Sequence, residues 1–183
     1  MNMIARSAEL SEIYEWSKNL NGYLINYFNL YVDKWSDKNI KKRCRDFNYI
    51  FNTIIREIEE NDMYSTHYTT LNNSINNYIT IQFQNHRLNC EKALNDSEEY
   101  ADIEYGKKIN DLCEDFYYIN NKLGEINNSY QCEEIFNYIE GQKSSLKTVY
   151  EDRSHKYSQY LVFHDFPSYN DFDNIKKNIK CKS

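Results

Sequence analysis

The chain has 183 residues, of which 40% are hydrophobic, and its formal net charge is −6 at pH 7. A chain of this length can bury one hydrophobic core, so we expect a single domain over residues 1–183. The acidic balance argues against a general nucleic-acid-binding protein, which needs a basic face to contact phosphates. Lysines and arginines do cluster near residues 38–45 and 176–182, and we interpret these clusters as solvated helix faces.

A helical hairpin is predicted over about residues 7–61. Apolar residues recur at spacings of three and four from Leu10 to Trp35, and Ser7 can cap this first helix. A second helix, from about residue 38 to 61, carries one apolar stripe: Ile40, Cys44, Phe47, Phe51, Ile54 and Ile58. The connection is two or three residues long, so the two helices should be antiparallel. We expect the second helix to lie at the centre of the core.

Residues 62–96 form a weaker segment. Apolar residues from Tyr64 to Ile79 are helically spaced, but they stand among Asn and Thr, which have poor helix propensity. We therefore expect a weaker helix with irregular ends and few buried contacts. A short helical turn around residues 87–94 should follow it.

Cysteine-bearing helices are predicted over residues 97–166. One should run from Asp102 to Ile126, and another should follow a turn at residues 127–129, with Gly141 as a point where it can kink. Pro167 ends this region, and a short C-terminal helix is expected over residues 169–181. The fold class is therefore all-α: a single irregular helical bundle of about five or six helices without a sheet.

The five cysteines are far apart and form no Cys-x-x-Cys pair, which argues against a zinc site. An odd number leaves at least one cysteine unpaired within the chain, and two bridges with one free thiol can be drawn in about 15 ways. Three of the cysteines lie on apolar stripes, where they would serve equally well as small buried thiols. Both alternatives stay open for Cys44, Cys90, Cys113, Cys132 and Cys181.

No stretch of the chain assembles a recognisable catalytic, cofactor or metal site. The four histidines have no metal-ligand spacing, and the chain contains neither a glycine-rich phosphate loop nor a Gly-x-Ser-x-Gly motif. We therefore expect a protein that is not an enzyme and binds no cofactor or metal. No apolar run is long enough for a transmembrane helix, so none is expected in this chain.

Tyrosine is abundant, with 18 residues, and tyrosine is typical of binding surfaces. The codons for Asn, Tyr, Ile and Lys are all rich in A and T, so a biased genome explains this abundance equally well. Four tyrosines that lie off the apolar stripes are candidates for an exposed binding face: Tyr23, Tyr49, Tyr105 and Tyr118.

Two motif regions, residues 44–51 and 132–151, together resemble the interspersed-repeat (PIR/VIR) variant antigens of malaria parasites. That family carries a cysteine before an Asn-Tyr-Trp-type helix, and later a cysteine followed by Tyr-Ile and a tyrosine near the helix end. The residues here that match the family core are Phe47, Tyr49, Phe51, Tyr138, Ile139 and Tyr150. Cys113 resembles the cysteine of the family's middle helix.

The chain departs from the family pattern at three places near its first motif. Ile50 stands where the family usually has Trp, Asn52 and Thr53 replace the family's Tyr-Asp, and the family's cysteine upstream of Cys44 is missing. This argues against a disulfide through Cys44. It indicates a divergent or truncated member, whose membrane association would depend on a missing region.

The resemblance implies a non-enzymatic variant antigen that is exported to the infected host cell or its surface. It would present a helical domain to a host protein or antibody, for host interaction and immune evasion. Sequence variation should then concentrate in the weaker segment, residues 61–96. The alternative is an intracellular helical scaffold or adaptor that binds a partner helix through an exposed apolar groove.

Overall fold

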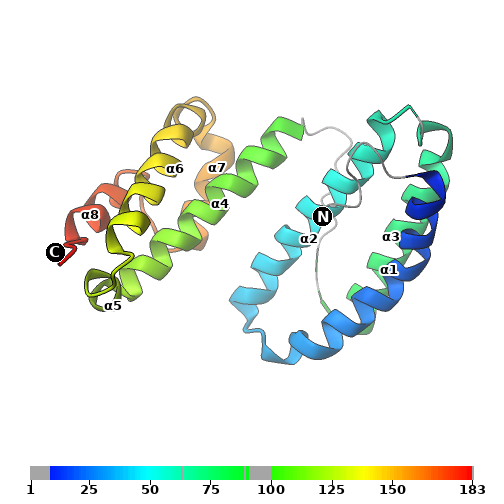
Figure 1. The fold of residues 1–183 in the computed structure, drawn as a ribbon, viewed down its shortest axis with the longest axis horizontal. Helices are drawn as coiled ribbons and strands as arrows, with labels where there is room; N and C mark the ends of the chain where they lie inside the picture. The colour runs from blue at the N-terminus through cyan, green and yellow to red at the C-terminus, as the bar shows by residue number, and fades with distance from the viewer. Residues whose placement is uncertain (1–8, 63, 89, 91–99, 183) are drawn as a thin grey trace. The chain divides into compact units, whose positions relative to one another are not determined.

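The computed structural model describes residues 9–62, 64–88, 90 and 100–182. Over these residues the regular structure is entirely helical, with eight α-helices and two short 3-10 helices (Figure 1). The predicted all-α class is therefore confirmed, whereas the predicted number of five or six helices was too low.

The chain divides into two compact units, unit 1 (Met1–Asp96) and unit 2 (Ser97–Ser183). Each unit has its own cluster of buried hydrophobic side chains. The division coincides with the boundary expected between the weaker segment and the cysteine-bearing helices. Length alone had led us to expect one domain, and nothing in the apolar spacing indicated two separate cores.

Unit 1 contains three α-helices and two 3-10 helices: α1 (Leu10–Tyr31), η2 (Val32–Lys34), α2 (Asp37–Glu60), η3 (Ser65–His67) and α3 (Tyr68–Asn85). Figure 1 shows α1 and α2 running in opposite directions, as the hairpin prediction required. Ser7 lies outside the described residues. Instead, Glu9 caps α1 through a capping box, in which the Glu9 backbone N–H donates a 2.9 Å hydrogen bond to Glu12.

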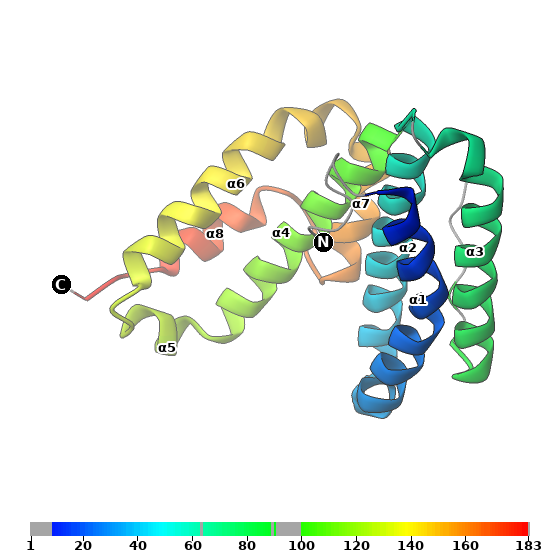
Figure 2. The ribbon, with the colours of Figure 1, turned by 45° about the vertical axis from the view of Figure 1, so that its right-hand side comes forward.

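The structure corrects the expectation that residues 62–96 make few buried contacts. Helix α3 packs against both α1 and α2 (Figures 1 and 2), and it buries Leu71, Ile75, Ile79 and Phe83. A helix with poor intrinsic propensity is stable when one complete apolar face is buried against neighbours. The Asn and Thr residues that suggested weakness therefore do not make α3 a marginal element.

An aromatic cluster joins the three helices of unit 1. The ring of Phe47 on α2 lies 5.2 Å from that of Phe28 on α1 and 5.9 Å from that of Phe83 on α3, measured between centroids. Phe51 and Ile54 are buried, while Phe47 itself is half-buried. The predicted inward face of α2 is thus confirmed, although α3 shares the centre of the unit with it.

Helix α3 ends in a Schellman motif. Arg87 has a left-handed backbone with φ 53°, and the Leu88 backbone N–H donates a 2.8 Å hydrogen bond to the carbonyl of Phe83. Leu88 is buried beside the helix end that it closes. Arg87 and Leu88 are therefore not helical, which corrects part of the turn predicted over residues 87–94; most of that range lies outside the described residues.

Unit 2 contains five α-helices: α4 (Tyr100–Asn121), α5 (Leu123–Asn127), α6 (Cys132–Asp152), α7 (Ser154–Phe163) and α8 (Asp171–Asn178). Helices α4 and α6 run antiparallel with the short α5 between them (Figure 1). The expected short C-terminal helix is α8, whose Phe172 ring stacks on Phe116 of α4 at 4.3 Å.

Two interruptions explain why the helix count was too low. The backbone leaves the helical conformation at Lys122, which separates α4 from α5, and at Arg153, which separates α6 from α7. Gly141 lies inside α6 and does not end it. Because neither break falls at a glycine or a proline, residue propensity gave no reason to expect them.

Candidate functional site

A hollow with a volume of about 520 Å³ lies within unit 2 between α4, α5 and α6. We call it the α4–α6 groove. The residues that line it are Asp115, Tyr118, Ile119, Lys122, Glu125, Ile126, Ser129, Gln131, Glu134, Ile135, Tyr138 and Ile139.

Helical spacing places these residues on two facing walls. On α4, Asp115, Tyr118 and Ile119 lie within about one turn of each other, so they share one face. On α6, Glu134 and Tyr138 are four residues apart and also share a face. Each wall therefore presents a carboxylate followed one turn later by a tyrosine.

The groove has an apolar floor and an aromatic rim. Ile119, Ile126 and Ile139 are buried, so they form part of the unit's core as well as the floor of the groove. Tyr118 and Tyr138 keep 59% and 56% of their surface exposed. An apolar floor can bury part of a ligand, while the polar groups around it can fix the ligand's orientation.

Acidic groups outnumber basic ones around the groove. Its lining contains three carboxylates, from Asp115, Glu125 and Glu134, and one ammonium group, from Lys122. The Lys122 Nζ lies 2.6 Å from an oxygen of Glu125, and this hydrogen bond raises the pKa of Lys122. The single base is thus already paired, and the groove carries a net negative charge.

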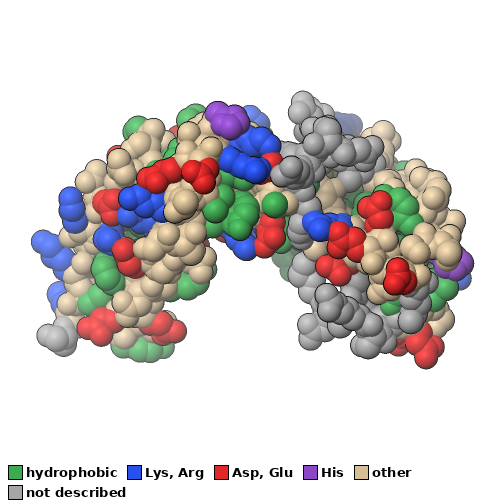
Figure 3. Space-filling model, turned by 90° about the horizontal axis from the view of Figure 1, so that it is seen from above, with side chains coloured by type: hydrophobic (Ala, Val, Ile, Leu, Met, Phe, Trp, Pro, Cys, Tyr) green, Lys and Arg blue, Asp and Glu red, His purple; other side chains and the backbone are tan. Residues whose placement is uncertain are grey.

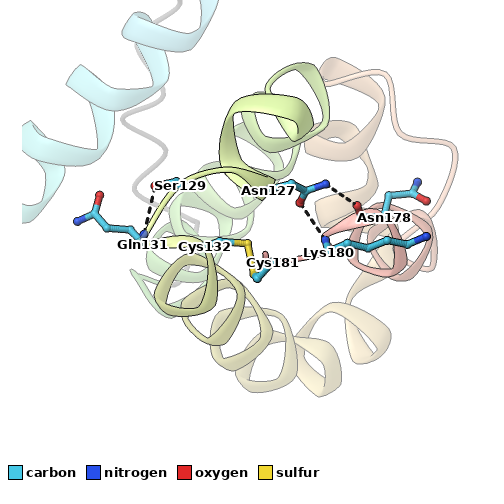
Figure 4. The surroundings of a disulfide bond; sticks show 7 residues. All are labelled: Asn127, Ser129, Gln131, Cys132, Asn178, Lys180 and Cys181. Carbon is cyan, nitrogen blue, oxygen red and sulfur yellow. Dashed lines mark hydrogen bonds between the residues drawn. A yellow bond between two sulfur atoms is a disulfide. The ribbon is translucent and has the colours of Figure 1, made fainter. Parts of the chain in front are cut away.

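A disulfide lies beside the turn between α5 and α6, next to the groove residues Ser129 and Gln131. Cys132 at the start of α6 is bonded to Cys181, and the two Cα atoms lie 5.5 Å apart (Figure 4). The side chain of Asn127 accepts a 2.9 Å hydrogen bond from the Lys180 backbone N–H and donates one of 3.2 Å to the Asn178 carbonyl. The C-terminal segment is therefore held against the turn between α5 and α6 by covalent and polar contacts together.

The structure resolves the alternatives left open for the cysteines. Cys44 is bonded to Cys90, with Cα atoms 5.2 Å apart, which corrects the expectation that Cys44 would be unbridged. The missing upstream cysteine does not matter, because the partner comes from the segment after α3. Cys113 is a free thiol, fully buried in the core of unit 2, and burial raises its pKa. A buried thiol of this kind is unreactive.

The residues that matched the family motif fall in different environments. Phe47, Tyr49 and Phe51 lie on α2 in unit 1, whereas Tyr138 and Ile139 line the α4–α6 groove in unit 2. Tyr150 is half-buried, and its ring stacks on Tyr169 at 4.7 Å. Most of the motif residues are therefore buried or half-buried. Tyr138 is the one residue of this motif set with a large exposed side chain.

The four candidate tyrosines are divided between the two units and differ in exposure. Tyr23 and Tyr118 are exposed, but Tyr23 belongs to unit 1 and Tyr118 to unit 2. Tyr49 and Tyr105 are half-buried. Only Tyr118 of this set lines the groove, and Tyr138, which was predicted to belong to the family core, lines it as well.

A second polar cluster in unit 2 surrounds the buried carboxylate of Asp102. Arg153 and Lys156 both form ion pairs with it, and the Tyr157 hydroxyl donates a 3.1 Å hydrogen bond. The hydrogen bond from Lys156, aided by those from Tyr157 and Arg153, lowers the pKa of Asp102 against the opposing effect of burial. Burial, aided by Asp102, raises the pKa of Tyr157 to about 12. The cluster fastens α7 onto α4, and a carboxylate held by two cations is a weak proton acceptor.

Charges of both signs are interspersed on the face of the molecule in Figure 3. Within the basic cluster at the start of α2, the Lys42 Nζ lies 2.7 Å from an oxygen of Asp46. Near the C-terminus, the Lys176 Nζ lies 2.7 Å from an oxygen of Glu140. Neighbouring acids thus neutralise part of each basic cluster.

Within the described ranges, no three His, Cys, Asp or Glu side chains gather where they could hold a metal ion. None of the helices described here combines the length and apolar character needed to cross a bilayer.

No family model, curated protein or solved structure matches this chain. The α4–α6 groove is therefore described as a candidate site from its own geometry and lining residues. Sequence reasoning missed this groove, although one signal was present: an acidic residue stands one turn before a tyrosine on two consecutive long helices.

Proposed function

We propose that this chain is a non-catalytic, disulfide-stabilised helical binding protein that acts outside the reducing cytosol. The observation that carries the proposal is the pair of disulfides, one in each unit. Disulfides persist in oxidising compartments and are rare in cytosolic proteins, where thiols are kept reduced. A structural bridge in each unit is therefore what a secreted or surface-displayed protein would need.

The α4–α6 groove supports binding as the activity. It combines buried isoleucines with two exposed tyrosines, and aromatic side chains give large contact areas at low entropic cost. The titratable cluster around Asp102 consists of charges that are already paired with each other. Its chemistry suits structural stabilisation better than proton transfer.

With the resemblance to the PIR/VIR family, the proposal becomes more specific: an exported or surface-displayed variant antigen of a malaria parasite, with a host protein or antibody as its partner. The part of that hypothesis that placed variation in residues 61–96 loses its physical reason, because α3 is packed on two sides. Exposed positions, such as those around Tyr23 and Tyr138, are freer to vary.

The alternative is an intracellular helical scaffold. The groove itself is compatible with it, since an apolar channel can accept a partner helix in any compartment. The two hypotheses differ in the state of the cysteines. A cytosolic scaffold would have five free thiols, whereas the proposed antigen would have the bridges Cys44–Cys90 and Cys132–Cys181.

Two measurements on protein from the native source test the proposal. Alkylation of free thiols before reduction, followed by mass spectrometry, should label only Cys113 after unfolding. Antibodies raised against the oxidised chain should label intact host cells or the compartment outside the parasite cytosol. Five labelled cysteines together with signal confined to the parasite cytosol would reject the antigen and favour the scaffold.

A further inference from the structure

We propose that the α4–α6 groove binds a cationic amphipathic helix of a partner protein, with apolar side chains on the isoleucine floor and arginine or lysine at the rim. The inference rests on the proposed binding function but is independent of the compartment. It names the chemistry of the partner, which neither the sequence nor the family resemblance specifies.

The floor explains why the partner should be amphipathic. Ile119 from α4, Ile126 from α5 and Ile139 from α6 converge beneath the groove. From Asp115 to Ile119 the α4 wall spans about 6 Å, or about one helical turn. A partner helix that places apolar residues at spacings of three and four could lay one face along this length.

The rim explains why the partner should be cationic. Asp115 and Glu134 stand on opposite walls, and the one lysine of the lining is paired with Glu125. A basic side chain brought to the rim would meet carboxylates of opposite charge, whereas an acidic one would be repelled. Charge therefore selects between amphipathic helices that the floor alone would accept equally.

The tyrosines add a second preference for cations. Tyr118 and Tyr138 are more than half exposed at the rim, and a guanidinium or ammonium group placed over such a ring is attracted to its face. Because α4 and α6 run antiparallel, the order of carboxylate and tyrosine is reversed on the two walls. A cation at either end of the groove thus has both types of group within reach.

The test uses a fluorescently labelled model peptide of about 15 residues, long enough to form a helix on binding. It contains leucine at helical spacing on one face and arginine on the other. A second peptide replaces every arginine with glutamate. Fluorescence anisotropy with the oxidised full chain should give a dissociation constant of about 1–100 μM for the arginine peptide. The glutamate peptide should bind at least tenfold more weakly, and added salt should weaken the binding of the arginine peptide.

Matched variants locate the binding site. The double variant Tyr118→Ala/Tyr138→Ala should bind the arginine peptide about tenfold more weakly, or weaker still. Its control is Tyr130→Ala, since Tyr130 is 95% exposed and does not line the groove. Glu134→Gln should weaken binding about threefold to fivefold, while Glu133→Gln, which removes the same charge from an exposed neighbouring position outside the lining, should change it little. Circular dichroism should show equal helix content in all four variants.

Several outcomes would overturn the proposal. Equal affinity for the two peptides would remove the charge argument, and an unchanged affinity of the tyrosine double variant would move the site elsewhere. Dimerisation of the chain through this groove without peptide, detected by sedimentation and abolished by the double variant, would make a second copy the occupant. A failure here would leave the thiol and localisation results of the proposed function unaffected, so the two can fail separately.

Discussion

In both units one disulfide joins the second long helix to a segment beyond the last helix. Cys44 on α2 is bonded to Cys90, 46 residues later, and Cys132 on α6 to Cys181, 49 residues later. Each unit also contains a helix that ends in the same way, with a histidine at the C-cap, a left-handed non-glycine residue and then a buried apolar residue. In unit 1 these are His86, Arg87 and Leu88.

In unit 2 the corresponding helix end is that of α7. Asp165 has φ 65°, and the Phe166 backbone N–H donates a 2.9 Å hydrogen bond to the carbonyl of Leu161. The cores, however, differ in chemistry. Aromatic rings connect the helices of unit 1, whereas in unit 2 ion pairs also connect different helices, such as Asp102 on α4 with Lys156 on α7 and Lys143 on α6 with Asp173 on α8. The same covalent and backbone framework can therefore support both an apolar core and a more polar one.

Removal of either disulfide should have the largest effect and should break the parallel between the units. Cys44→Ser/Cys90→Ser and Cys132→Ser/Cys181→Ser should each lower the free energy of unfolding of the affected unit by about 4 kcal/mol, because the loops closed are of nearly equal length. Residue-resolved hydrogen exchange in the full chain would measure each unit. An equal loss of protection in both units from one double variant would show that they do not behave separately.

Changes at Asp102 should reveal the polar character of unit 2. Asp102→Asn should cost about 2–3 kcal/mol, because the charge-assisted hydrogen bonds that Asp102 accepts from Lys156 and Arg153 are lost. Since the native pKa of Asp102 is lowered, its stabilisation is present above the ordinary value of 3.8 and is lost as pH falls through the native value.

Urea unfolding of unit 2 at a series of pH values would measure this dependence. The fall in stability below pH 3.8 should be shallower in Asp102→Asn than in the unaltered chain. Part of the fall should persist, because the hydrogen bond from Lys143 lowers the pKa of Asp173 in the same direction. Asp152→Asn, at an exposed position nearby, is the matched control. If Asp152→Asn lowered the stability of unit 2 as much as Asp102→Asn does, the role given to the Asp102 ion pairs would be wrong.

The smallest predicted effect compares the two helix ends. Arg87→Gly and Asp165→Gly should each stabilise their unit by about 0.5–1 kcal/mol, because glycine removes the cost of a left-handed backbone. The gain should be larger for Arg87, since aspartate tolerates this conformation better. Thermal unfolding would measure the change, with Arg87→Ala as a control that keeps the steric cost. A clear loss of stability in both glycine variants would contradict this account of the turns.

Helix positions were predictable because they follow from local spacing. The stripe on α2 and the presence of α1 needed only the recurrence of apolar residues, although α1 ends at Tyr31 rather than at the expected Trp35. Helix α8 needed only Phe172 and Ile175 after Pro167. The large contribution of α3 to the buried core of unit 1 was not predictable in this way. Its asparagines lower intrinsic propensity, but burial depends on partners that are distant in sequence.

The breaks and the groove were beyond the reach of local patterns. Helix α6 ends just before Arg153, where the chain turns and brings Lys156 and Tyr157 to Asp102, about 50 residues earlier in the sequence. The spacing of apolar residues carries no information about such a distant contact. The disulfide partners likewise depend on tertiary contacts. The groove depends on how α4 and α6 face each other. In the sequence its residues are indistinguishable from other exposed polar and buried apolar positions along two helices.

The buried free thiol of Cys113 bears on how the chain acquires its bridges. During oxidative folding five thiols compete, and about 15 pairings with two bridges are open to them. Once α4 packs against α6 and α8, Cys113 is inaccessible and its raised pKa keeps it protonated, so it cannot attack a disulfide. Early formation of the unit 2 core would thus protect the correct pairing, whereas oxidation that precedes this packing would trap Cys113 in scrambled isomers.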